Sequence, residues 1–297
     1  MSSTLDPKKR YLIVNADDLG MSRAVNRAIF EGHERGIVTS ASIMATGAEF
    51  DDAVAGARAR PELGVGVHLV LHDERPAAPV EKIPALVGAD GRLKPLGTVV
   101  SALFFGRIPR EQVETEYAAQ IERVTRAGLV PTHLDSHCHL HALPSVGRIV
   151  HDLGVRFGVV CARRPEFSSI SEFQGAPIAR YPLSILITLS NKFARRGDAD
   201  RLQMPDEFIG LVKSGEVDKL WLERALAKLA RGKVSELMVH PSDGTDAGNA
   251  NARYGAARRR AEFEAVTAPE VRAALAHNDV ELVNYRYLAS RPTPERP

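Results

Sequence analysis

Four of the ten histidines in the chain fall in one short stretch, PTHLDSHCHLH, at residues 131–141. Histidine and aspartate side chains at such a spacing can hold metal ions or move protons. In an extended strand, the residues that would share one face are His133, Asp135, His137, His139 and His141. A strand rises about 3.3 Å per residue, so the first and last of these lie roughly 26 Å apart and cannot bind one ion. The stretch therefore supplies one or two ligands, such as His137 and His139, and the others must come from elsewhere.

Ionisable residues also stand on or after three other strand-like segments. The first segment ends in Asn15-Ala16-Asp17-Asp18, the third carries His68, and a later one ends in His240. Each alone has a plain structural explanation, because an aspartate can cap a helix and a single histidine in an apolar strand is usually a core residue. If the strands are parallel, however, all of these side chains meet at one end of the sheet.

The chemistry of this set is that of a metal-dependent hydrolase. One aspartate and two histidines leave open positions on a divalent ion, as hydrolysis requires. A second carboxylate can take a proton from water, and a histidine on the opposite side can give a proton to the leaving group. The last step matters most for an amide, because an amine leaves poorly unless it is protonated. These residue types therefore indicate metal-assisted amide hydrolysis.

Short apolar segments alternate with longer helical patterns along most of the chain. The sequence predicts strands at residues 11–16, 38–45, 64–71, 131–141, 156–161, 236–240 and 280–285. It predicts helices at residues 21–35, 51–60, 111–127, 144–153, 184–195, 217–230 and 256–276. This alternation favours a parallel sheet covered by helices. We therefore expect an α/β fold, an irregular TIM-like (β/α) barrel with parallel strands, and the alternative is an open doubly wound sheet.

The elements fill residues 1–290, which we expect to form a single domain, and the proline-rich tail at 291–297 is predicted to be disordered. The loop at 72–107 is too long for a simple connection between a strand and a helix. It is either a lid or wall of the substrate site or a neutral surface insertion. Residues 168–217 have the least clear pattern.

The charges are nearly balanced, with 39 basic and 37 acidic residues and a formal net charge of +2 in 297 residues. No overall field therefore favours nucleic acid or an anionic membrane as a partner. The two cysteines, Cys138 and Cys161, lack CxxC spacing, so we expect no disulfide framework and a location in the reducing cytoplasm. The amino terminus does not have the pattern of a signal peptide. The longest apolar segment elsewhere, residues 181–189, is far shorter than the about 20 residues of a membrane span.

Four motifs together resemble the YdjC-like carbohydrate deacetylase family, which includes chitooligosaccharide deacetylases. They are NADDLG at residues 15–20, GVHL at 66–69, HLDSHCHLH at 133–141 and VHP at 239–241. The motifs are in the family order, and the resemblance covers residues 11 to about 288. It implies a barrel-like α/β fold, removal of acetyl groups from N-acetylated sugars, and one divalent metal ion, magnesium or zinc.

The resemblance also implies roles for individual residues. Asp18, His68 and His137 would be the metal ligands. Asp17 would be the general base that acts on water, and His240 would be the general acid that protonates the departing amine.

Four more residues are expected to orient the ligands or to contact the sugar: Asp135, His139, His141 and Arg164. Arg164 has a simpler explanation as one half of a surface ion pair. Cys138 departs from the family pattern, where many relatives have a larger polar residue. On an extended strand it would face away from His137, so we expect it in the core.

The substrate stays open between a free oligosaccharide and a sugar carried by a lipid. A branch of the family associated with hopanoid biosynthesis is also similar, notably in HLVLHD at residues 68–73 and DGR at 90–92. A glycolipid substrate would be compatible with peripheral association with a membrane, and a homodimer is compatible with the sequence. Two other functions are alternatives: a barrel metallohydrolase with a two-metal centre at His137-x-His139, and a non-catalytic sugar-binding protein.

Overall fold

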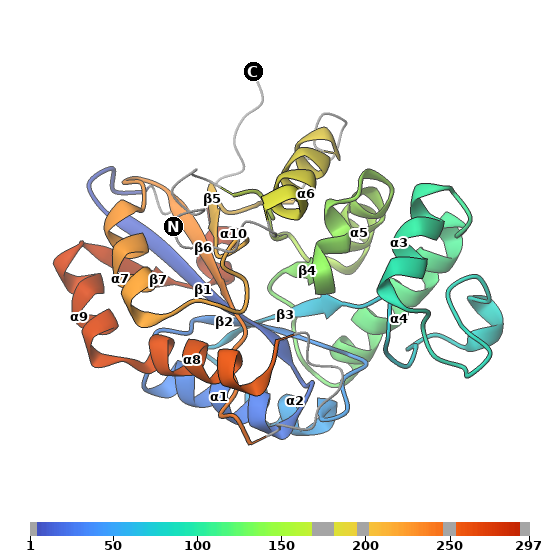
Figure 1. Cartoon of the computed structure of the whole chain (residues 1–297), viewed down its shortest axis with the longest axis horizontal. Helices are drawn as coiled ribbons and strands as arrows, with labels where there is room; N and C mark the ends of the chain where they lie inside the picture. Colours follow the sequence, from blue (N-terminus) through green and yellow to red (C-terminus); the bar gives the residue numbers. More distant parts are fainter. Residues whose placement is uncertain (1–4, 168–180, 195–201, 246–253, 292–297) are drawn as a thin grey trace.

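Parallel strands curl around the centre of the molecule in the computed structural model (Figure 1), which describes residues 5–167, 181–194, 202–245 and 254–291. The strand order is β4-β3-β2-β1-β6-β5, and β7 pairs with β1. All of these pairs are parallel. The strands are β1 (Arg10–Leu19), β2 (Ser40–Ile43), β3 (Gly64–Leu69), β4 (Leu134–Ser136), β5 (Glu207–Ile209), β6 (Val234–Val239) and β7 (Val280–Val283). This arrangement confirms the α/β class and is that of an irregular TIM-like barrel.

Helices surround the strands. In Figure 1, α1, α2 and α8 lie below the sheet, α7 and α9 lie to its left, and α3, α4 and α5 lie to its right. The helices are α1 (Arg23–Glu34), α2 (Phe50–Arg58), α3 (Leu96–Phe104), α4 (Arg110–Arg126), α5 (Pro144–Phe157), α6 (Tyr181–Ala194), α7 (Lys219–Lys228), α8 (Ala256–Thr267), α9 (Pro269–His277) and α10 (Tyr285–Ala289). Two short 3₁₀ helices are η1 (Val80–Lys82) and η2 (His137–Ala142).

The helix boundaries follow local chemistry. Ser22 caps α1, because its hydroxyl accepts a hydrogen bond from the Val25 amide. The single helix predicted at 256–276 is wrong, since the chain forms α8 and α9 with Ala268 extended between them. Pro269 is the cause: its ring disfavours helical geometry at the preceding residue, and it suits the first turn of a new helix.

The strand predicted at 156–161 is also wrong. Helix α5 continues to Phe157 and ends at Gly158, whose φ of 71° is left-handed. Cys161 and Ala162 then make only isolated bridges, to Gln203 and Leu134. These bridges nevertheless join β4 to the segment that leads into β5, so they continue the curl of the sheet.

The histidine stretch is extended only as far as Ser136. Cys138 and His139 both have a φ of 57°, which turns the chain into η2. The prediction that residues 131–141 form one strand is therefore wrong beyond Ser136. The expected place of Cys138 in the core is wrong for the same reason: its side chain is half-buried, beside His137.

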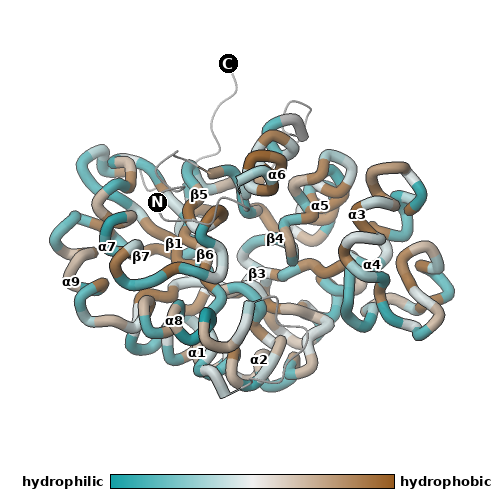
Figure 2. Tube along the Cα trace, viewed as in Figure 1, coloured by the Kyte–Doolittle hydropathy of each residue, from teal (hydrophilic) through white to brown (hydrophobic). Residues whose placement is uncertain are grey.

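The two faces of the sheet have different neighbours. Leu12 and Val14 belong to the main hydrophobic core, which lies between the strands and the helices. Tyr11 and Ile13, on the other face of β1, pack in a smaller cluster with Cys161. This alternation follows from the two-residue period of a strand. Figure 2 shows the hydrophobic segments on the central strands and on the helices that cover them.

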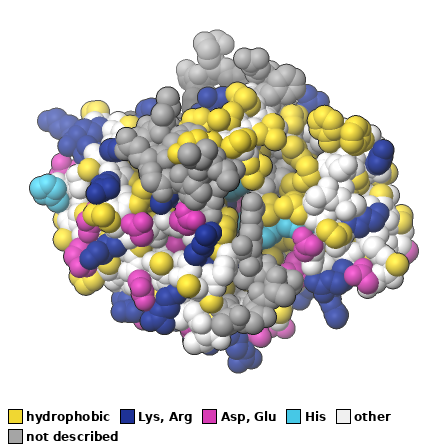
Figure 3. All heavy atoms as spheres, viewed as in Figure 1, with side chains coloured by type: hydrophobic (Ala, Val, Ile, Leu, Met, Phe, Trp, Pro, Cys, Tyr) yellow, Lys and Arg dark blue, Asp and Glu magenta, His cyan; other side chains and the backbone are white. Residues whose placement is uncertain are grey.

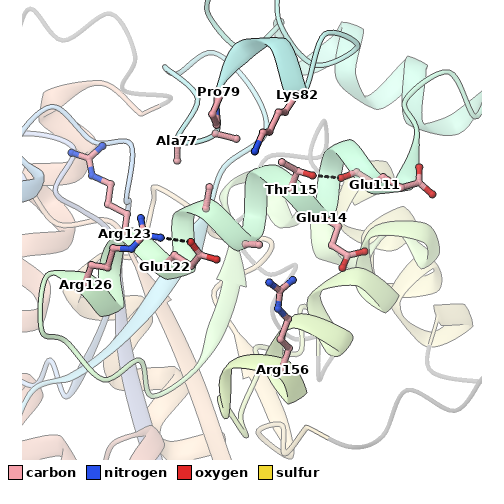
Figure 4. A pocket seen from close by; sticks show the side chains of 13 residues that line it. Ala77, Pro79, Lys82, Glu111, Glu114, Thr115, Glu122, Arg123, Arg126 and Arg156 are labelled. Atoms are coloured by element: carbon pink, nitrogen blue, oxygen red, sulfur yellow. Dashed lines mark hydrogen bonds and ion pairs between the residues drawn. The ribbon is translucent and has the colours of Figure 1, made fainter.

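The long insertion at 72–107 is folded onto α4. The backbone amides of Ala77 and Ala78 donate hydrogen bonds to the buried Glu116 carboxylate, at 2.9 Å each. A cavity of about 780 Å³ lies between the insertion, α4 and Arg156 of α5, and charged side chains of both signs line it (Figure 4). The insertion is therefore packed against α4 through these hydrogen bonds.

Two further predictions concern regions that the structure describes only in part. Of the predicted tail, residues 292–297 lie outside the described residues, whereas Arg291 forms an ion pair with Asp206 at 3.0 Å. Of the unclear region 168–217, residues 168–180 and 195–201 also lie outside them. Among the helices that the structure describes, none is long and apolar enough to cross a membrane.

Candidate metal centre

Three potential ligands meet at the carboxyl ends of β1, β3 and β4. Asp18 Oδ1 lies 3.1 Å from His137 Nδ1 and 3.4 Å from His68 Nε2. The two histidine nitrogens are 3.2 Å apart. Asp18 has a φ of 70°, and the register between β1 and β2 shifts between Ala16 and Leu19. This irregularity lets two consecutive aspartates, Asp17 and Asp18, both reach the same end of the barrel.

The donor set fits a divalent ion. Asp18 Oδ1 is buried and has no hydrogen-bond partner of good geometry among the described residues, although two imidazole nitrogens surround it. Burial alone raises the pKa of Asp18, but the charges of Arg259 and His137 outweigh it and hold that pKa well below its usual range. The carboxylate is therefore ionised at neutral pH. A buried anion with two imidazoles is a common ligand set for zinc and other divalent metals.

Asp135 orients His68. Its Oδ1 is 2.8 Å from His68 Nδ1, so the other nitrogen of the ring faces Asp18. Burial lowers the pKa of His68, but the Asp135 carboxylate outweighs it and the pKa is raised. Asp135 Oδ2 is held in turn by Arg163 at 2.9 Å. A carboxylate behind an imidazole in this way fixes the ring and its tautomer in metal sites.

Arg163 is the centre of the buried charges, and the sequence reasoning missed it. Its guanidinium contacts both oxygens of Asp17, at 2.7 and 2.6 Å, and its Nε donates to Glu236 Oε1 at 2.9 Å. The predicted residue, Arg164, instead forms an ion pair with Glu166 at 3.0 Å. Alternation could have shown this, because Cys161 faces the barrel interior and Arg163 follows it by two residues.

The ion pair with Arg163 decides the charge of Asp17. Burial alone raises the pKa of Asp17, but the Arg163 guanidinium outweighs it, so the pKa is lowered. Glu236 responds differently, because burial outweighs Arg163 and raises its pKa to about 7. Tyr285 donates a hydrogen bond to Glu236 Oε2 at 2.7 Å. The barrel interior therefore holds Asp17 as an anion that is paired with Arg163.

His240 lies close to Asp17. Its Nε2 is 3.9 Å from Asp17 Oδ2. Its backbone amide donates to the buried Glu262, whose Oε2 also lies 3.6 Å from His240 Nδ1. The ring packs edge-on against Tyr254, with 4.8 Å between centroids. Asp17 and His240 therefore face one another beside the proposed ligands.

The remaining histidines of the stretch have separate positions. His133 stacks on Tyr285, with 3.7 Å between ring centroids, and Gly66 leaves room for it, because a Cβ there would lie 2.4 Å from the ring. His141 Nδ1 is 2.6 Å from Ser136 Oγ, and burial lowers the pKa of His141 to about 3. Burial also holds the pKa of His139 well below its usual range. Its ring centroid lies 6.0 Å from that of Phe208.

Two other groups near the site were not expected. Arg259, fully buried on α8, binds Asp18 Oδ2 and so shares this carboxylate with the two histidines. His72, His137 and Cys138 form a second group of possible ligands, with one ligand atom of each within 4.8 Å of the others. No local pattern marks Arg259, which stands in the run RRR at 258–260.

His137 and His139 do not belong to one group of possible metal ligands in the described structure. In the described part of the chain, each ligand group that contains His137 lacks His139. Asp243, the carboxylate available after β6, is bound by Arg27 at 2.7 Å and by Thr245.

Figure 3 shows histidine side chains in a hollow near the centre of one face, below a group of apolar side chains. The cavity between the insertion and α4 shares no lining residue with the ligand group.

The fold and this site define an α/β barrel with a candidate metal centre at the carboxyl ends of its strands. The family model described as YdjC-like protein matches residues 11–277, and the chain belongs to this family. The family expected from the motifs is thus confirmed.

Named relatives resemble the chain over most of its length. A protein named carbohydrate deacetylase from Geobacillus stearothermophilus is 33% identical over 277 residues, which are 93% of this chain and 97% of the relative. One named chitooligosaccharide deacetylase from Klebsiella pneumoniae (strain 342) is 32% identical, over 94% of this chain and 99% of the relative. A crystal structure from Enterococcus faecalis V583, named as a candidate cellobiose-phosphate cleavage protein, has a TM-score of 0.75 and 26% identity, and the match covers 94% and 99% of the two chains.

Proposed function

We propose that the protein is a metal-dependent hydrolase that removes acetyl groups from N-acetylated sugars. The observation that carries this proposal is the group Asp18, His68 and His137, which lies beside Asp17 and His240. Two full-length relatives with deacetylase names support the reaction class. A sugar-binding protein would need neither a base nor an acid beside a metal ligand set.

Asp18, His68 and His137 would hold one divalent ion. Such an ion supplies Lewis-acid chemistry, since it lowers the pKa of water and polarises a carbonyl group. Magnesium and zinc are the two candidates, and two imidazole nitrogens with one carboxylate favour zinc, because magnesium prefers oxygen ligands. The half-buried Cys138 thiol adds a soft donor close by.

Asp17 would act as the general base. Its pKa is lowered by Arg163, so it is an anion over the neutral pH range and can accept a proton. Arg163 holds both carboxylate oxygens, so the side chain has one orientation. The two adjacent aspartates thus have different partners, Arg163 for Asp17 and Arg259 for Asp18.

His240 would act as the general acid. Its Nε2 lies 3.9 Å from Asp17 Oδ2, and Glu262 anchors the residue through the backbone amide. A proton from this ring would go to the nitrogen of the departing amine, which would otherwise be a poor leaving group. Asp135 would position His68, whereas His139 and His141 would border the substrate side of η2. For Arg164, the ion pair with Glu166 supports a structural role.

The substrate would be an N-acetylated sugar, either a free oligosaccharide or one linked to a lipid. The test is release of acetate from N-acetylglucosamine oligomers by the full chain, first stripped of metal with a chelator and then reconstituted with zinc or magnesium. We expect acetate only from the reconstituted protein. Equal release before and after reconstitution would contradict the metal-dependent reaction. A lack of release from both free and lipid-linked substrates would contradict the deacetylase assignment.

The metal content of ligand variants gives a separate prediction. His68→Ala and His137→Ala each remove one of three protein ligands, so we expect the bound zinc to fall from about one ion per chain to well below one. His139→Ala is the matched control, because His139 lies in the same segment but outside the ligand groups. Elemental analysis of the three purified variants measures the result. Unchanged zinc in both ligand variants would show that the ion is held elsewhere.

A further inference from the structure

A second group of ligand atoms shares His137 with the candidate metal centre. One ligand atom each of His72, His137 and Cys138 lies within 4.8 Å of the other two. Of these residues, the proposed deacetylase reaction uses His137 alone. Two imidazoles and a thiol are a softer donor set than the carboxylate and two imidazoles of Asp18, His68 and His137. The two groups therefore suit different metal ions.

His72 has the hydrogen bonding of a metal-binding histidine. Its Nδ1 lies 2.9 Å from Asp73 Oδ2, and that oxygen also accepts a hydrogen bond from the Leu96 amide at 3.3 Å. The carboxylate favours the tautomer with the proton on Nδ1, which leaves the lone pair of the ring on Nε2. His72 is only 4% exposed, and its Nε2 is buried without a hydrogen-bond partner among the described residues. Buried polar atoms are rarely left in this state, and a nitrogen with such a lone pair can bind a metal ion.

The backbone places the Cys138 thiol beside His137. Cys138 has a φ of 57°, so its side chain does not point away from His137 as it would in a strand. The thiol is instead a hydrogen-bond partner of the His137 ring. The centroids of the His72 and His137 rings are 5.2 Å apart. The segment after β3 and the start of η2 therefore bring the three donors together.

Solvent reaches part of this group. The His137 side chain is 14% exposed and Cys138 is half-buried, whereas the side chains of Asp18 and His68 are 0% and 2% exposed. Both of the donors that solvent reaches, His137 and Cys138, belong to the second group. An ion can therefore enter this group directly.

His137 can serve only one of the two groups at a time. A neutral imidazole has a proton on one nitrogen and a lone pair on the other. His137 Nδ1 lies 3.1 Å from Asp18 Oδ1 and 3.2 Å from His68 Nε2, so the ring completes the first group. Two divalent ions beside one buried ring would also repel each other. An ion in one group therefore deprives the other group of its shared ligand.

We propose that His72, His137 and Cys138 form a second metal site, for a soft, thiophilic divalent ion, that competes with the candidate metal centre for His137. As the ion binds, the Cys138 thiol gives its proton to solvent, and the thiolate sulfur becomes a ligand together with one nitrogen of each imidazole. Thiolate sulfur prefers soft ions, whereas the Asp18 carboxylate prefers harder ones. A soft ion therefore draws His137 away from Asp18 and His68. Only the resulting inhibition of acetate release rests on the proposed function.

The test is titration of the metal-free full chain with cadmium alone, followed by ultraviolet difference absorption. A bond between a thiolate and cadmium gives a charge-transfer band that carboxylate and imidazole ligands do not give. We expect the band to reach its end point at roughly one cadmium ion per chain. Cys138→Ser should abolish the band. Cys161→Ser is the matched control and should keep it, because the buried Cys161 thiol instead donates to the Tyr285 carbonyl at 3.7 Å.

A pair of histidine variants tests the part that His72 plays. Asparagine at position 72 keeps a donor for Asp73 near the place of Nδ1 but lacks Nε2. His72→Asn should weaken cadmium binding by at least about tenfold, the lower end of what loss of a group behind a metal ligand costs. His151→Asn is the control and should bind cadmium like the natural protein. His151 is also buried, with its Nδ1 3.4 Å from the following Asp152, and belongs to none of the ligand groups of the described residues.

Displacement of zinc measures the competition between the two sites. Zinc-loaded protein is mixed with cadmium, desalted and analysed for both metals. We expect the natural protein to lose roughly one zinc ion for each cadmium ion that it binds, and Cys138→Ser to retain its zinc. Cadmium should also inhibit acetate release by the natural protein more strongly than by Cys138→Ser, when each is compared with its own rate without cadmium.

Three results would overturn the second site. They are no charge-transfer band in the natural protein, a band that persists in Cys138→Ser, and loss of the band in His68→Ala, which would show that all of these donors hold one ion. Zinc and cadmium bound together without displacement would contradict the competition. A normal cadmium band without acetate release from any substrate would reject the deacetylase assignment alone, and acetate release without a cadmium band would reject the second site alone.

Discussion

Replacement of Asp17 by asparagine is expected to lower kcat for acetate release by about 10²–10⁴-fold and to leave the metal content unchanged. Asparagine has nearly the same shape and keeps an oxygen that can accept from Arg163, but it cannot take up a proton. Asp18, His68 and His137 are untouched by the substitution, so the ion should stay. Loss of activity with full metal content is the expected signature of a missing base.

The measurement pairs acetate release with elemental analysis of the same sample. Asp243→Asn is a matched control: Asp243 also follows a strand, but it is bound by Arg27 and Thr245 away from the ligand group. We expect activity within about twofold of the natural protein for this variant, since surface substitutions of this kind have small effects. If Asp17→Asn kept full activity with normal metal content, another group would be the base.

Replacement of Arg163 by methionine is expected to lower the free energy of unfolding by about 3–5 kcal/mol. The side chain is fully buried and pairs with Asp17, Asp135 and Glu236, and methionine fills much of the same space without a charge. Three buried acidic groups would then lose the cation that they share. Unfolding in urea measures the change.

Arg164→Met is the neighbouring control for this stability effect. Arg164 is partly exposed, forms an ion pair with Glu166 and donates to the Asp206 carbonyl at 3.3 Å, whereas Arg163 is fully buried among three acidic groups, so we expect a smaller loss for Arg164→Met than for Arg163→Met. A loss in Arg163→Met no larger than that in the control would contradict the central role of Arg163 in the buried network.

The pH dependence of activity distinguishes an electrostatic role of Arg163 from a purely structural one. Arg163 lowers the pKa of Asp17, so its removal should raise that pKa. A base with a higher pKa becomes protonated at higher pH, and the acidic limb of the pH profile of kcat should move upward in the remaining folded protein. An unmoved acidic limb would mean that Arg163 does not set the ionisation of Asp17.

Much of the fold and part of the site could be predicted from the sequence. The alternation of strands and helices predicted the parallel α/β barrel, because each element must bury one apolar face. Parallel strands bring their carboxyl ends together, so the ionisable residues at those ends could be grouped from the sequence, and the resemblance to the family singled out Asp18, His68 and His137. The structure brings their ligand atoms to within 3.4 Å. Local periodicity failed where single residues change the backbone, at Cys138, Gly158 and Pro269.

By itself, the sequence determined the family, the barrel and the residues at the strand ends, because these depend on motifs and on patterns between near neighbours. Only the tertiary structure decided which charges pair in the interior. Arg163 and Asp17 are 146 residues apart, and Arg259 and Asp18 are 241 apart. No local spacing connects such residues, and only burial forces them together, since an unpaired charge is costly inside the barrel. The orientation of α6 was decided in the same way, because Thr188 and Asn191 are buried through hydrogen bonds with Phe167 and Glu166.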